Sequence, residues 1–278
     1  MKRSKIKTKY LEQINSSLSK QKLEKNIFET NLSQKESPTS TIDDFSIFDK
    51  IEKKLFCCLI AFGIILLYIF KDIIPLLGIT FLGESLETIS ITKKVLFFMI
   101  GDILILAFFI WFYRKDLFTN FKNFFGKNFG KNIGFSLLFW ICGLILMMIS
   151  NNIISIIRDG AIASNEEGVR SLIDIAPWYM AFETIIFAPV VEELVFRKNI
   201  QTVFHNKYLY VFVSGFVFGG MHVFFSMTSA LDLLYLVPYC SLGFIFAALY
   251  QRTDNIFSTI TVHSIHNTLA FLLYLVAI

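Results

Sequence analysis

The chain has 278 residues, of which 55% are hydrophobic and 32 are phenylalanine. Together with a mean hydropathy of +0.60, this composition excludes an ordinary soluble domain, because so much apolar surface cannot be hidden from water inside one core. The formal net charge of +4 is modest and unevenly placed, which indicates membrane topology and not binding to nucleic acid.

Residues 1–54 form a polar N-terminal tail that holds twelve Lys or Arg residues. Its composition predicts a disordered or partly helical segment in the cytosol. A long polar stretch precedes the first apolar run, and no small-residue cleavage pattern follows that run. We therefore expect no removable signal peptide.

Seven mainly apolar runs follow, each near the length of about 20 residues that a membrane-spanning helix needs. They cover residues 55–70, 95–113, 133–157, 176–204, 209–225, 231–250 and 256–278. The segment 73–82 either extends the first run or forms a re-entrant piece. The predicted fold is all-α, a polytopic membrane helix bundle of about seven transmembrane helices, with a range of roughly six to eight.

The charges of the loops predict an orientation for these spans. The second loop holds five Lys or Arg residues against Asp116, whereas the third loop, 158–174, holds four acidic residues against two arginines. Because basic loops stay in the cytosol, we expect a cytosolic N-terminus and a third loop on the outer face. The expected location is the cell membrane.

Ionisable residues within apolar runs are costly and indicate function. In the fourth run, Glu193 and Arg197 share a helix face and are predicted to form an ion pair. Glu192 lies about 100° away on the helix and lacks that partner, which suits a general acid or base. Pro189 is expected to bend the helix and open room for water or substrate.

Two later runs add imidazoles. Phe218 and His222 share a face of the fifth run, with two glycines between them that permit close helix approach. His263 and Asn267 lie one turn apart in the seventh run, and His266 lies on nearly the same side, so either imidazole fits an inward position. A carboxylate, two imidazoles and an amide form a plausible water-activating and oxyanion-stabilising set. Asp102 has no evident partner, and Glu183 is expected to be a supporting or pore-lining residue.

These residues occur in the order EExxxR, FxxxH and HxxxN, a pattern that resembles the CAAX protease and bacteriocin-processing family, also called CPBP or Abi. The resemblance covers residues 176–278, a CAAX-protease-like catalytic core behind N-terminal transmembrane helices at 55–157. It implies an intramembrane endopeptidase whose site opens to the cytosol. It also implies that Glu192 and His222 activate water and that His263 and Asn267 stabilise the oxyanion, with Glu193, Arg197 and Phe218 as support.

The family has been described as metalloproteases, and Glu192, His222 and His263 offer a ligand set for zinc. No HExxH helix is present. Asn267 suits an oxyanion donor better than a zinc ligand, which favours direct glutamate catalysis without a cofactor.

The resemblance also implies biological roles. The substrate is expected to be a peptide or protein in or at the lipid bilayer, and the abundance of Lys, Asn, Ile and Phe suggests a bacterial source. Bacterial relatives act in bacteriocin self-immunity, in the maturation of exported peptides and in regulation of membrane sensor kinases. The alternative is a non-catalytic membrane scaffold that regulates a sensor kinase or confers immunity. A transporter is disfavoured because no internal repeat is evident.

Overall fold

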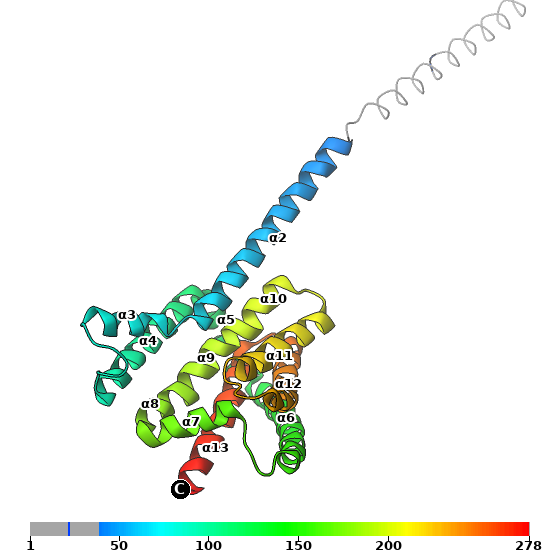
Figure 1. The fold of residues 1–278 in the computed structure, drawn as a ribbon. Coiled ribbons are helices and arrows are strands. Elements are labelled where there is room, and N and C mark those ends of the chain that lie inside the picture. The colour runs from blue at the N-terminus through cyan, green and yellow to red at the C-terminus, as the bar shows by residue number, and fades with distance from the viewer. Residues whose placement is uncertain (1–21, 23–38, 278) are drawn as a thin grey trace, which may run out of the picture. The chain divides into compact units, whose positions relative to one another are not determined.

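The structure is a computed structural model that describes residue 22 and residues 39–277. The described residues from Phe56 onward belong to one compact unit, and those before Phe56 belong to another unit. The prediction for the polar tail falls mostly outside the described residues. Every regular element in the described part of the chain is a helix (Figure 1), which confirms the predicted all-α fold.

The N-terminal helices are α2 (Thr39–Ile69), α3 (Ile73–Phe81), α4 (Ile91–Phe112), α5 (Arg114–Phe124) and α6 (Phe129–Ile157). The axes of α2 and α3 differ by 52° across a short break, so the predicted segment 73–82 is a separate, bent piece. Helix α4 begins after Ser90, whose side chain accepts a hydrogen bond from the backbone N–H of Lys93 and thereby satisfies a free donor of the first turn.

The C-terminal helices begin with α7 (Ser164–Ile175). The predicted run 176–204 is then a chain of helical pieces with two π-helical segments: α8 (Pro177–Phe182), η1 (Glu183–Phe187), α9 (Ala188–Glu193), η2 (Leu194–Asn199) and α10 (Ile200–Val203). π turns are often found at functional sites. The first of them stands directly before the helical piece that carries Pro189, the residue expected to disturb the helix.

The last elements are α11 (Lys207–Phe224), the 3-10 helix η3 (Ala230–Tyr235), α12 (Leu236–Thr253) and α13 (Ile256–Ala277). Glycines bring α11 and α12 into backbone contact. A Cβ atom on Gly219 would lie 2.4 Å from Sγ and 2.7 Å from the backbone nitrogen of Cys240, and one on Gly243 would lie 2.6 Å from the carbonyl oxygen of Gly215. The close approach predicted for the fifth run is therefore present at Gly219.

Among the described residues, five helices are long and apolar enough to cross a membrane, or six if α2 and α3 count as one bent span. The run from Pro177 to Val203 is not one of them, since it is interrupted by π turns and carries several charges. Large apolar side chains on α4 and α6 face outward, as expected where lipid replaces water. The chain is a multi-pass membrane protein.

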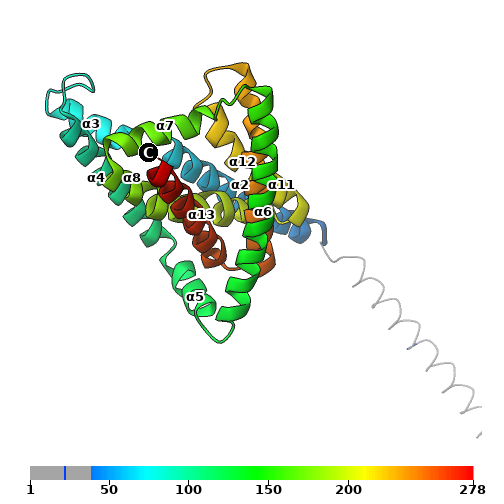
Figure 2. The ribbon, with the colours of Figure 1, turned by 90° about the horizontal axis from the view of Figure 1, so that it is seen from below.

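Figure 2 shows α5 and α7 at opposite ends of the bundle, with α6 and α13 running between them. At the end that we call the α5 face, the side chain of Asn120 bonds to the backbone of Ile256, and Asp116 pairs with Lys198 at 2.8 Å. At the end that we call the α7 face, Arg158 pairs with Asp232 at 2.5 Å. Each of these contacts joins residues that are far apart in the chain.

Candidate active site

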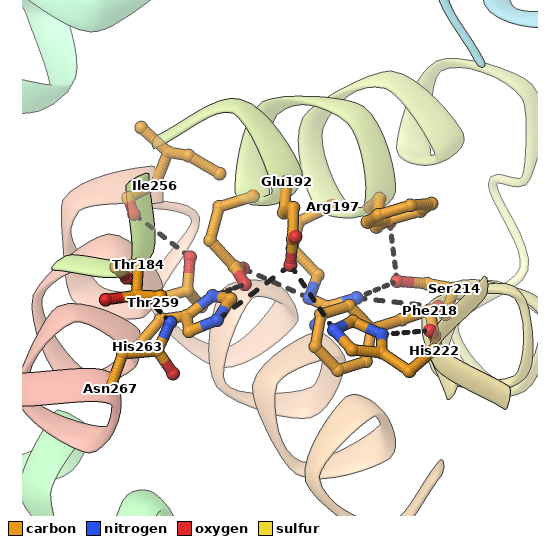
Figure 3. Close-up of polar contacts among 12 residues, drawn as sticks. Thr184, Glu192, Arg197, Ser214, Phe218, His222, Ile256, Thr259, His263 and Asn267 are labelled. Atoms are coloured by element: carbon orange, nitrogen blue, oxygen red, sulfur yellow. Dashed lines mark hydrogen bonds and ion pairs between the residues drawn. The ribbon is translucent and has the colours of Figure 1, made fainter. Parts of the chain in front are cut away.

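Asn267 completes the hydrogen bonding of the π turn η1. In a π turn the carbonyl of one residue accepts from the N–H five residues later, and Ala188 donates to Glu183 in this way. The next residue, Pro189, has no N–H, so the carbonyl of Thr184 lacks the corresponding partner. The side-chain nitrogen of Asn267 donates to that carbonyl at 2.8 Å (Figure 3). Asn267 therefore ties α13 to the helix that carries both glutamates.

Glu193 holds together a fully buried layer beneath the site. Its Oε2 lies 3.1 Å from Nε of Arg197, the predicted ion pair, and its Oε1 lies 2.9 Å from Nδ1 of His263. The guanidinium of Arg197 also donates to Oγ of Ser214 at 3.2 Å and lies 4.6 Å from the ring centroid of Phe218. The predicted supporting residues thus form one connected layer.

Glu192 is the carboxylate that faces the pocket. Its Oε1 accepts a 2.8 Å hydrogen bond from the phenol of Tyr68. Its Oε2 lies 3.9 Å from Nε2 of His222 and 3.9 Å from Nε2 of His263, between the two imidazoles in Figure 3. Both separations exceed direct hydrogen-bonding distance and match the spacing of groups that share a water or substrate atom.

The partners of the two imidazoles decide which nitrogen faces Glu192. Nδ1 of His222 lies 2.8 Å from the carbonyl oxygen of Phe218, and Nδ1 of His263 lies 2.9 Å from the Glu193 carboxylate. Carbonyl and carboxylate oxygens only accept, so each Nδ1 carries the hydrogen and donates it. Nε2 of each ring is therefore the nitrogen turned towards Glu192, and the FxxxH spacing serves to fix the tautomer of His222.

The structure also separates His263 from His266, which the sequence left equivalent. Nδ1 of His266 accepts a hydrogen bond from Nε1 of Trp140 at 3.4 Å, on the side of α6. His263 is the imidazole that faces Glu192.

A pocket of about 280 Å³ joins these groups. Its walls include all four residues predicted to be catalytic, Glu192, His222, His263 and Asn267. Glu183, expected to line a pore, also lines this pocket.

Two further polar residues, of which only the first lines the pocket, come from the first apolar run and its end. Tyr68 lines the pocket, and a neutral tyrosine in an apolar run gives no sequence signal of a functional role. Asp102, which lacked an evident partner, lies 3.3 Å from Nζ of Lys71 and accepts a 2.7 Å hydrogen bond from the phenol of Tyr179. Lys71 carries the signal that was missed, because a lysine beside a span needs a partner such as Asp102.

The residues present do not form a ready metal site. In the described part of the chain, no group of three or more His, Cys, Asp or Glu side chains has an arrangement that holds a metal ion. The zinc alternative with Glu192, His222 and His263 therefore gains no support from their arrangement.

Residues 174–269 match the family model described as type II CAAX prenyl endopeptidase Rce1-like. The chain carries an Rce1-like segment. This segment contains all four predicted catalytic residues, and the match confirms the resemblance to the CAAX protease family that the three motifs indicated.

Two bacterial proteins are similar to the chain. One, from Bacillus subtilis (strain 168), is named "Putative membrane peptidase YdiL" and is 30% identical over 152 residues, or 52% of this chain and 59% of that protein. The other, from Lactococcus lactis subsp. lactis (strain IL1403), is named "UPF0177 protein YxdF" and is 27% identical over 144 residues, or 50% of this chain and 77% of that protein. No solved structure matches the chain.

Proposed function

We propose that the chain is an intramembrane endopeptidase that hydrolyses peptide bonds of membrane-associated peptides or proteins. The observation that carries the proposal is the position of Glu192 Oε2, which is buried, accepts no hydrogen bond from the described residues and lies 3.9 Å from Nε2 of both His222 and His263. The Rce1-like match of residues 174–269 supports the same reaction class.

In this mechanism one water donates its two hydrogens to Oε2 of Glu192 and to Nε2 of His222. Its lone pair then points at the carbonyl carbon of the scissile bond. Glu192 takes the proton as the new C–O bond forms and later gives it to the departing amine, so protons balance over the cycle. The hydrogen bond from Tyr68 to Oε1 leaves Oε2 as the reacting oxygen.

The oxyanion accepts hydrogen bonds from His263 and Asn267. Nδ1 of His263 already donates to Glu193, so donation from Nε2 requires the imidazolium form. The carboxylates of Glu193 and Glu192, at 2.9 Å and 3.9 Å from this imidazole, together balance its charge and that of Arg197. Asn267 uses one N–H for the Thr184 carbonyl and has a second for the oxyanion.

The test compares membrane peptidomes of the native host carrying the wild-type chain, Glu192→Gln, His222→Ala or His263→Ala at equal protein levels. Loss of a general base lowers turnover by about 10²- to 10⁴-fold, so one set of peptides should vanish in all three variants. His266→Ala is the matched control, since its imidazole bonds to Trp140 and not to the pocket.

If the variants behave as wild type while deletion of the chain has a phenotype, the endopeptidase proposal fails. A non-catalytic scaffold that regulates a sensor kinase or confers bacteriocin immunity is then the better account. If the peptides vanish, their identity distinguishes the maturation of exported peptides from bacteriocin self-immunity.

A further inference from the structure

We infer that the pocket opens on the α7 face, that this face lies outside the cytosol, and that the substrate is a polypeptide segment presented at the outer surface of the membrane. The first two parts rest on geometry and charge, and the substrate class rests on the proposed function.

Each helix around the pocket contributes only its part on the α7 side of the catalytic groups. From α13 the wall is formed by residues from His263 to Tyr274, and from α11 by residues from Phe218 to His222, near the end of that helix. The wall also includes five residues of α7 and none of α5. The space above Glu192 therefore extends towards α7 and away from α5.

A second pocket of about 390 Å³ continues in the same direction. It shares part of its wall with the first pocket, including Met147 on α6 and Tyr239 on α12, and reaches the segment Ala161–Ala163 beside α7. The ring of Tyr239 also stacks on His222 with centroids 5.0 Å apart. Two adjoining pockets offer room for residues on both sides of a scissile bond, as an extended polypeptide needs.

The rim of this opening is polar. Glu166 and Arg170, which line both pockets, form an ion pair at 2.9 Å, and each side chain is 40% exposed. The guanidinium of Arg170 lies 5.2 Å from the ring centroid of Tyr274. Such groups belong at the water interface and not in hydrocarbon, so the opening meets the aqueous surface.

The charges assign a side to each face. Residues 114–131, which cover α5 and the first turn of α6, hold five Lys or Arg residues against Asp116, whereas residues 158–174, which include most of α7, hold four acidic residues against two arginines. Under the positive-inside rule the α5 face is cytosolic and the α7 face is outside. The cytosolic opening that the family resemblance implies is not compatible with this orientation.

The experiment labels single cysteines in full-length protein in intact and permeabilised cells with a sulfonated, membrane-impermeant maleimide. The background replaces the four free cysteines Cys57, Cys58, Cys142 and Cys240 by alanine. Glu167→Cys reports the exposed side of α7, Ala270→Cys reports the shared wall of the two pockets, and Lys122→Cys reports the exposed side of α5.

We expect Glu167→Cys and Ala270→Cys to react in intact cells, and Lys122→Cys to react only after permeabilisation. The inference is overturned if Ala270→Cys reacts only after permeabilisation, or only after denaturation. Labelling does not require turnover. If the cysteines react as expected but the chain has no peptidase activity, the proposed function fails while the position of the opening stands. The substrate class is overturned if the peptides that depend on Glu192 come from cytosolic segments.

Discussion

The phenol of Tyr68, in the first membrane helix, donates a 2.8 Å hydrogen bond to Oε1 of Glu192, in the helix that begins more than a hundred residues later in the chain. Tyr68 lies outside the Rce1-like segment, residues 174–269. The N-terminal part of the chain thus positions the carboxylate of the C-terminal part. This contact fixes which oxygen of Glu192 turns towards His222.

Tyr68→Phe should lower turnover without unfolding the protein. Hydrogen bonds to charged groups contribute about 1.5–3 kcal/mol, which corresponds to a loss of roughly 10- to 100-fold in kcat. The measurement is peptide release by purified protein in detergent, using a peptide found by peptidomics. Tyr208→Phe, at a side chain that is 74% exposed, is the control. Equal rates for the two variants would contradict the positioning role.

Breaking the buried Glu193–Arg197 pair should lower the free energy of unfolding far more than breaking an exposed ion pair. Glu193→Gln leaves the Arg197 cation buried without its partner, at a cost of about 3–5 kcal/mol. Glu166→Gln breaks the half-exposed pair with Arg170, worth about 0–1 kcal/mol. Thermal unfolding in detergent measures both. Similar decreases in Tm for the two variants would show that the buried Glu193–Arg197 pair contributes no more to stability than the exposed pair.

The contact between α11 and α12 should not tolerate a methyl group. Gly219→Ala would place Cβ 2.7 Å from the backbone nitrogen of Cys240, and overpacking of this kind costs about 1–3 kcal/mol. Gly134→Ala on α6 meets no atom within 4 Å and should stabilise the helix by about 0.5–1 kcal/mol. Opposite shifts in Tm are expected, and a destabilised Gly134→Ala would refute the packing argument.

Chelation tests the zinc alternative directly. In the glutamate mechanism, turnover of a peptide by the purified protein is unchanged by 1,10-phenanthroline. Loss of turnover that added Zn²⁺ restores would instead make Glu192, His222 and His263 metal ligands. The non-chelating isomer 1,7-phenanthroline is the control for inhibition by the aromatic molecule itself.

The short-range part of the site was predictable from the sequence. Spacing alone places Glu193 one turn from Arg197, and the structure has that pair. The choice between His263 and His266 was not predictable, because it depends on Trp140 of another helix. Tyr68 was missed for a similar reason, since only tertiary packing brings its phenol to Glu192.

The positions of the π turns were not predictable either, although part of their cause is visible in the sequence. Pro189 predicts the loss of one backbone hydrogen bond. Whether the helix then kinks or forms a wider turn depends on which group replaces the missing donor. Here the replacement is the amide of Asn267, a residue on α13.

The side chain of Asn267 replaces the backbone hydrogen-bond donor that Pro189 lacks. Pro189→Ala would supply an N–H for the Thr184 carbonyl and free the Asn267 amide from that hydrogen bond. The direct hydrogen bond between α13 and the helix that carries Glu192 therefore exists because Pro189 lacks a hydrogen atom.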